Sequence, residues 1–291
     1  MVTLAVDVGG SATRCELWDD ELIEAFEQSG RANVTLDPEH AVTHLASIVA
    51  AHPADRIVAS VPGGGDPVSR RILLDGLGPL VEVPVLVVPD WVAAYRACLD
   101  TTPGTLLIAG TGAVAVTVDD QVSYFGNGGP LFGDDGSSFW IGREAVRLVL
   151  RRRELGESGG ELGRRLDEAL GAETRSLVPR TNSIMSDRHE LARLAPVVDA
   201  VAAHDEGAAE VLRRAGAALA ELVTMSRAAR GRHAVAAVGG VFGSSIVVDT
   251  LEAAVGPVRR ASMSLAGAAV AIDRGDAPRL LLEHTSRSHN I

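Results

Sequence analysis

Short apolar runs and longer amphipathic segments alternate along this chain. Apolar runs bounded by turns of small or polar residues predict buried strands, and these cover residues 2–8, 15–18, 21–28, 56–61, 83–88, 106–109, 113–118, 234–238 and 258–261. Segments with apolar residues every three or four positions predict helices, which cover residues 38–51, 92–99, 139–170 with a break at 158–160, 190–230 and 265–273, and one more begins near 246. The polar end, 284–291, is predicted to be frayed.

Two places in the chain share a pattern of strand, glycine turn and strand. Residues 106–109 run into Gly110-Thr111-Gly112 and continue as 113–118, which predicts a β-hairpin with bare backbone N–H groups at its turn. Residues 2–8 likewise run into Gly9-Gly10-Ser11-Ala12. Each turn is a candidate phosphate cradle, although ordinary hairpins also contain such glycines. The repetition is typical of duplicated half-domains that face a cleft.

Three polar residues follow or end predicted strands and are candidates for chemistry. Asp7 ends the first strand, where a carboxylate is costly unless it is bonded, so it either approaches a metal-bound phosphate or closes the hairpin. Asp90 follows the strand 83–88, at the strand end where open α/β sheets bind ligands, and it is also placed to cap the next helix. Asn33 precedes the helix 38–51, where it caps the helix or turns its amide to a hydroxylated ligand.

Two further glycine-rich stretches carry candidate binding groups. Gly133-Asp134-Asp135-Gly136-Ser137 precedes a predicted helix, which Ser137 or Ser138 is expected to cap. Acidic side chains in such a loop bind a polyol, a metal or the backbone. The second stretch, Gly239-Gly240-Val241-Phe242-Gly243-Ser244-Ser245, follows the strand 234–238 and opens a helix. It can receive a phosphate or an adenine ring that lies against bare backbone.

The composition fits a globular protein of two domains. The chain has 291 residues, of which 46% are hydrophobic and 3% aromatic, and this is enough for two cores. It has no apolar run of about 18 residues, so we expect neither a membrane span nor a signal peptide, and a cytoplasmic location. Cys15 and Cys98 are too few for a four-cysteine zinc site and are expected to be buried free thiols.

The charged residues exclude several classes of function. A net charge of -11 argues against a nucleic-acid partner, which needs a basic surface. The chain contains no lysine, because all 27 basic residues are arginines. Mechanisms that need a lysine are therefore excluded, among them the Walker A loop, the protein-kinase lysine and Schiff-base catalysis. If the chain handles ATP, it does so with glycine turns and a metal.

These motifs resemble the actin, heat-shock chaperone and sugar-kinase superfold, and within it the N-acetylglucosamine kinase family, also called the BadF/BadG/BcrA/BcrD ATPase family. The stretch 7–13 resembles the first phosphate motif, Gly110-Thr111-Gly112 the second, and 238–242 the adenosine motif. The most specific resemblance is that of 133–137, together with Trp140-Ile141-Gly142, to a Gly-Asp-Glu-Gly-Ser and Trp-Ile-Gly block. The resemblance runs through nearly the whole chain.

The resemblance implies an α/β protein with two ribonuclease-H-like (actin-like ATPase) domains that face a central cleft. The expected domains are 1–104 and 105–262, with a helix at about 263–275 that packs back on the first domain and a tail at 276–291. The implied activity is an ATP-dependent kinase that uses Mg²⁺ and phosphorylates a hydroxyl of an amino sugar, N-acetylglucosamine or glucosamine. A homodimer is expected, with neither nucleic acid nor membrane as a partner.

The resemblance also implies roles for individual residues. Asp90 is expected to accept the proton of the sugar hydroxyl, and Asp7 to hold Mg²⁺ through water. The residues expected to contact ATP are Asp7, Gly9, Gly10, Ser11, Thr13, Gly110, Thr111, Gly112, Gly239, Gly240 and Ser244. The residues expected to contact the sugar are Asn33, Asp90, Ala113, Val114, Gly129 and Asp134.

Departures from the family concern the sugar. Ala113 and Val114 stand where amino-sugar kinases of the family often have Ser and Asn, and Gly128 replaces a usual Trp. Two other functions stay open. One is an ATP-driven activator of an electron-transfer enzyme, which would hold an iron–sulfur cluster with paired cysteines, and the other is a nucleotide-binding regulator without turnover. The ROK family of sugar kinases is disfavoured because its cysteine-rich zinc motif is absent.

Overall fold

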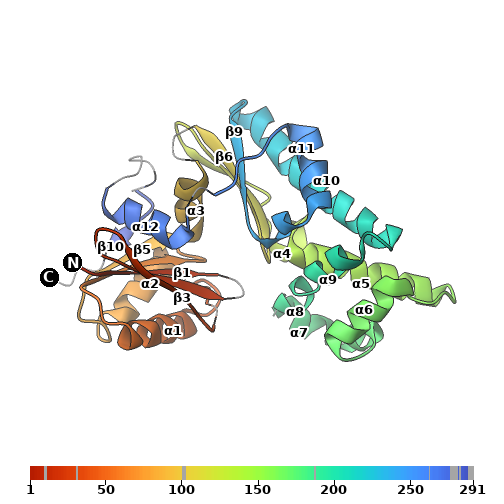
Figure 1. The fold of residues 1–291 in the computed structure, drawn as a ribbon, viewed down its shortest axis with the longest axis horizontal. Helices are drawn as coiled ribbons and strands as arrows, with labels where there is room; N and C mark the ends of the chain where they lie inside the picture. Colours follow the sequence, from red (N-terminus) through yellow and green to blue (C-terminus); the bar gives the residue numbers. More distant parts are fainter. Residues whose placement is uncertain are drawn as a thin grey trace. The chain divides into compact units, whose positions relative to one another are not determined.

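The chain divides into two compact units (Figure 1). The first comprises Met1–Thr102 and Ala261–Ile291, and the second comprises Pro103–Arg260. The computed structural model describes residues 1–9, 12–30, 32–99, 103–186, 188–261, 263–275, 281 and 283–287. Each unit has its own sheet and its own hydrophobic core.

The sheet of the first unit has the order β10-β5-β4-β1-β2-β3. Its strands are β1 (Thr3–Val8), β2 (Thr13–Trp18), β3 (Leu22–Gln28), β4 (Arg56–Val61), β5 (Val85–Pro89) and β10 (Ser286–Arg287). The β1, β4 and β5 strands run parallel, whereas β2 and β3 extend the sheet as antiparallel hairpins. The carboxyl ends of the three parallel strands therefore meet at one end of this sheet.

Helices pack on both faces of the first sheet (Figure 1). They are α1 (Pro38–Ala51), α2 (Pro67–Leu77), α3 (Asp90–Cys98) and α12 (Leu265–Asp273). Val6 of β1 belongs to the core that α1 and α2 close, whereas Ala5 packs against Val270 of α12. Side chains alternate between the two faces of a strand, so Asp7 lies on the same face as Ala5. The α2 helix, capped by Asp66, was not predicted.

Residues 284–287 correct the prediction of a frayed end for the part of it that the structure describes. β10 pairs antiparallel with β5. Arg70 donates from Nη1 to the backbone oxygen of His284 at 2.7 Å and to that of Gly64 at 2.9 Å. The His284 ring packs edge-on against Trp91, with 5.1 Å between ring centroids. This segment is therefore fastened beside β5 and the start of α3, while 276–280, 282 and 288–291 lie outside the described residues.

The sheet of the second unit has the order β8-β7-β6-β9. Its strands are β6 (Gly104–Ala109), β7 (Ala113–Val118), β8 (Val122–Phe125) and β9 (Ala234–Val238). The predicted last strand is reduced to Arg259, whose backbone exchanges two hydrogen bonds of 2.9 Å with Ala237 and Val235 of β9. With Arg259 counted as a fifth strand, this sheet has the order 3-2-1-4-5 when strands are numbered within the unit, and the first sheet has the same order with β10 added beyond β5 as a sixth strand.

The rest of the second unit is mainly helical. Its helices are α4 (Gly129–Phe132), α5 (Ser138–Glu154), α6 (Gly160–Leu170), α7 (Thr181–Ser186), α8 (His189–Ala192), α9 (Ala195–Val201), α10 (Glu206–Arg230) and α11 (Ser245–Val255), with 3₁₀ turns at Thr174–Arg180 and Gly240–Gly243. Ser137 caps α5 by accepting a hydrogen bond from the Trp140 N–H at 3.1 Å, so one of the two predicted caps is confirmed. The segment predicted as helix over 190–230 is three helices, α8 to α10.

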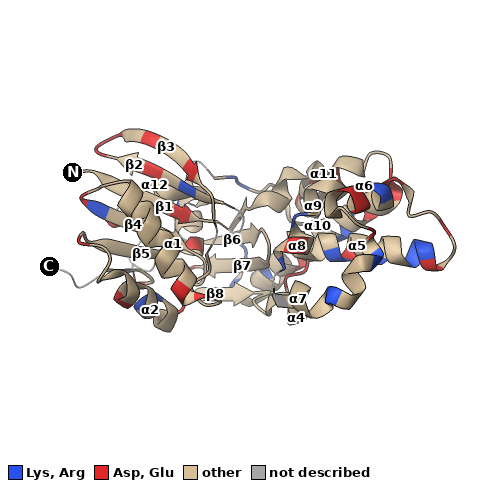
Figure 2. Cartoon of the chain, turned by 90° about the horizontal axis from the view of Figure 1, so that it is seen from below, with Lys and Arg blue, Asp and Glu red and all other residues tan. Residues whose placement is uncertain are grey.

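The surface of these helices mixes both signs of charge, as α5 and α6 show in Figure 2. Arg164 pairs with Glu168 one turn along α6, in the way predicted for the helical arginines. Within the described residues, we find no helix that is long and apolar enough to cross a membrane. The two sheets and their shared strand order confirm the predicted fold class of two ribonuclease-H-like α/β units.

Candidate functional site

The strand ends of the first unit bring two carboxylates within electrostatic range of each other. Asp7 is the penultimate residue of β1 and pairs in register with Ser60 of β4. Asp90 is the first residue of α3 and directly follows β5. Burial, reinforced by the nearby charge of Asp7, raises the pKa of Asp90 to about 6. These two predicted residues thus share one electrostatic environment.

Asp7 is almost fully buried, with 4% of its surface exposed. Ser60 donates a hydrogen bond from Oγ to Oδ1 of Asp7 at 3.1 Å. Burial raises the pKa of Asp7, and the Ser60 hydrogen bond and the charge of Arg14 oppose this effect only in part. A buried carboxylate in this situation is costly when it is ionised, so a cation beside it would be stabilising.

Asp90 is partly exposed at the start of α3. Its Oδ1 accepts a hydrogen bond from the Trp91 backbone N–H at 2.9 Å. The predicted capping role is wrong, because Pro89 occupies the N-cap position of α3 and no side chain caps this helix. With a pKa of about 6, the carboxylate is mostly ionised at neutral pH and still basic enough to accept a proton.

The glycine turn of the first unit lies between β1 and β2. The Gly9 N–H donates to the Ala12 backbone oxygen at 2.9 Å, and a Cβ on Gly9 would lie only 2.7 Å from that oxygen. Thr13 has no exposed surface, and its hydroxyl donates to the Gly30 backbone oxygen and lies 2.9 Å from Nε2 of His44. That hydroxyl is therefore bonded inside the unit. Gly10 and Ser11 lie outside the described residues.

Asn33 forms a turn of its own ahead of α1. Its Oδ1 accepts a hydrogen bond from the Thr35 N–H at 3.0 Å. Asp37 is the N-cap of α1, so the interpretation of Asn33 as the cap is wrong. The neighbouring Val34 donates its N–H to the Pro62 backbone oxygen at 3.0 Å. This bond joins the Asn33 turn to the loop that follows β4, the strand that pairs with β5, and β5 directly precedes Asp90.

The glycine turn of the second unit joins β6 to β7. The Gly110 N–H donates to the Gly112 backbone oxygen at 2.9 Å, and the Ser138 N–H donates to the Gly110 oxygen at 2.8 Å. Gly110, Thr111 and Gly112 are partly exposed. The turn is thus anchored on the first residue of α5 while its surface stays accessible.

Asp134 packs against this turn and has partners on both carboxylate oxygens. The Ala113 N–H donates to Oδ1 at 2.9 Å, and Nη1 of Arg188 donates to Oδ2 at 2.6 Å. A Cβ on Gly112 would lie 2.6 Å from Oδ1, so a larger residue there would displace the Asp134 carboxylate. Burial raises the pKa of Asp134, and the Ala113 N–H and the Arg188 guanidinium oppose this effect.

The other three predicted sugar contacts of the second unit are apolar. Ala113 and Val114 are the first residues of β7, the former buried and the latter partly exposed. Gly129 begins α4 with a φ of 65°, and no atom lies within 4 Å of its Cβ position. Ala113 is joined to Asp134 by its hydrogen bond.

The third glycine turn follows β9. Gly239 has a φ of 122°, and a Cβ there would lie 2.2 Å from the Ala109 backbone oxygen, whereas a Cβ on Gly240 would meet nothing within 4 Å. Ser244, at the start of α11, is 6% exposed, and its Oγ has no hydrogen-bond partner among the described residues. An open backbone and an orphaned hydroxyl beside a helix N-terminus suit an anionic or nucleotide ligand.

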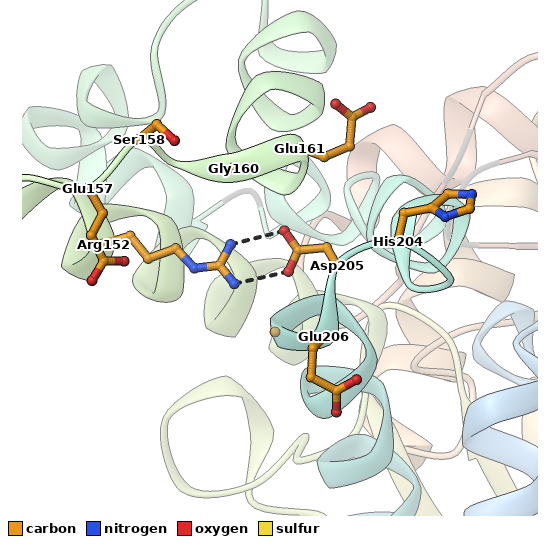
Figure 3. A pocket seen from close by; sticks show the side chains of 9 residues that line it. Arg152, Glu157, Ser158, Gly160, Glu161, His204, Asp205 and Glu206 are labelled. Atoms are coloured by element: carbon orange, nitrogen blue, oxygen red, sulfur yellow. Dashed lines mark hydrogen bonds and ion pairs between the residues drawn. The ribbon is translucent and has the colours of Figure 1, made fainter.

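A pocket of about 490 Å³ lies elsewhere in the second unit (Figure 3). Arg152 binds both oxygens of Asp205 at 3.0 Å across it. Asp205 also accepts hydrogen bonds from the Leu162 and Ala208 N–H groups. The charges of Arg152 and Asp205, at the centre of the pocket, thus neutralise each other and hold α5, α6 and α10 together. The pocket is therefore a structural junction.

Two residues of these sites were missed by the sequence analysis. Ser60 supports Asp7, and a polar residue near the end of the apolar run 56–61 was the available signal. Arg188 binds Asp134 from 54 positions away. No local pattern predicts that contact, because an isolated arginine in a polar segment is usually interpreted as solvent-exposed.

Two ribonuclease-H-like units, with glycine turns at their strand ends and neighbouring carboxylates in one of them, define the class of actin-like ATPases. Residues 90–265 match the BadF/BadG/BcrA/BcrD ATPase family. The match spans more than half of the chain, and the chain belongs to this family. The resemblance found in the sequence is thereby confirmed.

Solved structures share the fold over almost the whole chain. A proposed N-acetylglucosamine kinase from Chromobacterium violaceum is 19% identical with a TM-score of 0.73, covering 92% of this chain and 97% of its own. Another proposed N-acetylglucosamine kinase, from Porphyromonas gingivalis, is 18% identical with a TM-score of 0.73. The match covers 92% of this chain and 96% of the other. A ROK family glucokinase from Streptomyces griseus, solved with glucose and AMPPNP, is 18% identical with a TM-score of 0.57, covering 93% and 98%.

Proposed function

We propose that this chain is an ATP-dependent sugar kinase that transfers the γ-phosphoryl group of ATP to a hydroxyl of an amino sugar, N-acetylglucosamine or glucosamine. The observation that carries the proposal is the carboxylate of Asp90, held at the end of β5 beside Asp7 with a pKa of about 6. Family membership and the fold shared with sugar kinases support it.

Asp90 is the proposed general base. A base whose pKa lies near the working pH is ionised before the reaction and basic enough to take the proton of the attacking hydroxyl. The Trp91 N–H fixes one oxygen of the carboxylate and leaves the other for the sugar. Asn33, whose turn uses its amide oxygen, would offer its NH₂ group to a sugar hydroxyl.

The residues present fit a magnesium ion. Asp7 is a buried carboxylate with a raised pKa and one hydrogen bond from Ser60, and Mg²⁺ is bound through one or two carboxylates, phosphate oxygens and water. Among the described residues no group of three or more His, Cys, Asp or Glu side chains could hold a metal, so phosphate and water would supply most ligands. Bound Mg²⁺ would neutralise charge on the transferring phosphoryl group.

ATP would be held by backbone groups. The N–H groups of Gly9 and Gly110 bond within their own turns, so the other backbone N–H groups of the three glycine turns would bind ATP, and the orphaned hydroxyl of Ser244 offers a further partner. Phosphoryl transfer needs mainly positioning and charge neutralisation. Three such turns and a metal therefore suffice in a chain without lysine.

The sugar would meet a mixed surface in the second unit. A carboxylate has about four lone-pair positions, so Asp134 can accept a sugar hydroxyl in addition to its two present partners. Val114, which is partly exposed, provides methyl groups that suit the acyl methyl of an N-acetyl sugar, whereas the Ala113 side chain lies on the opposite face of β7, in the core of the unit. A site that lacks hydrogen-bond partners at one position discriminates there only modestly, on the order of tenfold to a few hundredfold.

The cysteines do not favour the electron-transfer alternative. Cys15 and Cys98 are both buried, and burial raises the pKa of Cys15 to about 11. A cluster ligand must be a thiolate, which burial of this kind disfavours.

Steady-state phosphorylation of a sugar panel tests the proposal. We expect activity with N-acetylglucosamine, glucosamine and glucose, with kcat/KM values that differ by about tenfold to a few hundredfold and the N-acetyl sugar preferred. A preference of about 10⁴-fold or more for one sugar would contradict the proposed pocket. ATP binding without phosphorylation of any sugar would favour a regulator instead.

A further inference from the structure

The ion pair of Arg188 with Asp134 differs from the other arginine pairs near it. The side chains of Arg188 and Asp134 are 23% and 9% exposed. Arg180, in the same helical region, pairs with Glu190 through a side chain that is 52% exposed. Exposed pairs contribute little, whereas breaking a mostly buried pair leaves an uncompensated charge.

The oxygen opposite Arg188 is the one that holds the β6–β7 turn. Oδ2 of Asp134 receives the guanidinium, and Oδ1 receives the Ala113 N–H. Ala113 is the first residue after Gly112, so this hydrogen bond fixes the exit of the turn. The Ser138 N–H fixes its entrance at Gly110. The carboxylate and the start of α5 therefore hold the turn from its two ends.

Asp134 has an unusual backbone that these bonds stabilise. Its φ of 60° is the only positive value among the non-glycine residues described. A side chain in this region is strained and persists where surrounding contacts determine it. The Ser137 N–H bonds to the Asp134 backbone oxygen at 3.0 Å, and Ala113 and Arg188 fix its side chain.

We propose that Arg188 is a positioning residue for the phosphate-binding turn Gly110–Gly112. By binding Oδ2 of Asp134, it orients the carboxylate so that Oδ1 stays on the Ala113 N–H, and it thereby keeps the N–H groups of the turn arranged for a phosphate. The phosphate part of this inference rests on the proposed function. The proposed positioning of the turn is independent of that function.

Hydrogen exchange of the Ala113 amide in the ligand-free protein tests the positioning. Arg188→Gln should accelerate this exchange by about tenfold or more, because a hydrogen bond to a charged group is lost or loosened. The matched control is Arg180→Gln, which breaks the exposed pair in the same region and should leave the rate within about twofold. Arg188→Lys, which keeps the charge, should restore part of the protection. An unchanged Ala113 rate in folded Arg188→Gln protein would overturn the proposal.

A double-mutant cycle shows whether Arg188 acts through Asp134. With Asp134→Asn already present, adding Arg188→Gln should change the Ala113 exchange rate by less than about twofold. An effect as large as in the parent protein would overturn the proposed route. If Arg188→Gln alone fails to fold, Arg188→Lys takes its place in the cycle, because lysine keeps the charge but lacks the planar guanidinium.

Binding of a non-hydrolysable ATP analogue tests the phosphate part. Its dissociation constant should rise by about tenfold in Arg188→Gln and stay within about twofold in Arg180→Gln. An unchanged affinity in Arg188→Gln would overturn the role in phosphate binding. If the parent protein does not bind the analogue, the proposed function fails, while the exchange measurement still decides the positioning of the turn.

Discussion

The strand ends of the two units carry carboxylates in contrasting surroundings. In the first unit, Asp7 accepts a hydrogen bond from Ser60 and Asp90 accepts one from the Trp91 N–H, and burial raises both pKa values. In the second unit, Asp134 has a backbone N–H on one oxygen and a guanidinium on the other. The same strand order thus supports carboxylates held by a hydroxyl or a backbone N–H in one unit and a carboxylate bound by an arginine in the other.

The comparison indicates that the buried carboxylates have different electrostatic roles in the two units. Burial raises the pKa of all three carboxylates, and one with a raised pKa that no cation binds is ready to accept a proton or a cation. A carboxylate between an N–H and an arginine instead fixes its neighbours. We infer that the first unit supplies the proposed chemistry, while the second supplies a rigid frame for phosphates.

The largest expected effect is on catalysis. Asp90→Asn should lower kcat by about a hundredfold or more and change ATP and sugar affinities by less than about tenfold, because it removes a base but preserves shape. Steady-state kinetics with separate titrations of both substrates measure this. Asp75→Asn, which alters an exposed carboxylate of the same unit, is the control. A kcat equal to that of the parent protein would show that Asp90 is not the general base.

The pH dependence should report the same carboxylate. With a pKa of about 6 for Asp90, the base is lost as pH falls, so kcat/KM should decrease by about tenfold per pH unit below about pH 6. N-acetylglucosamine is the suitable substrate because it carries no titratable amine. The residual activity of Asp90→Asn should lack this limb. A limb that persists in the variant would belong to a different group.

The glycines of the second unit offer a sharper comparison within one turn. Gly239→Ala should reduce the free energy of unfolding by about 3 kcal/mol, because φ is 122° and the new Cβ would lie 2.2 Å from the Ala109 oxygen. Gly240→Ala, one residue along, should change it by less than about 1 kcal/mol, since nothing lies within 4 Å of its Cβ position. Denaturant unfolding measures both. Equal losses would show that the turn does not depend on Gly239.

The sequence was sufficient for features that depend on local pattern. Buried strands ending in glycine turns were predictable because apolar periodicity and glycine act over a few residues. The α2 helix was missed, although Asp66 followed by Pro67 is a signal for a helix start. The C-terminal strand was missed because a polar segment gives no sign that Arg70 and Trp91 will hold it.

The candidate site was predictable in its residue types and less so in their partners. Asp7 and Asp90 were identified from strand ends, where topology alone brings groups together. The partner of Asp134 was not, since Arg188 lies 54 positions away and the contact depends on how the helices pack. The interpretations of Asn33 and Asp90 as helix caps were wrong because neighbouring Asp37 and Pro89 take those positions.

The smallest expected effects are on stability, and they should have opposite signs in the two units. Asp90→Asn should stabilise the protein by about 1–2 kcal/mol at pH 8, after allowance for partial exposure, because it removes a carboxylate whose pKa is raised on folding. This gain should shrink as pH falls through about 6 and vanish only below about pH 3, where the parent residue is protonated in both the folded and the unfolded state. Asp134→Asn should instead destabilise by about 1–3 kcal/mol, because the loss of its mostly buried ion pair with Arg188 outweighs the relief of burying a carboxylate whose pKa is also raised. Denaturant unfolding at about pH 3 and about pH 8 distinguishes these outcomes, and a loss of stability in Asp90→Asn at the higher pH would contradict the division of roles between the units.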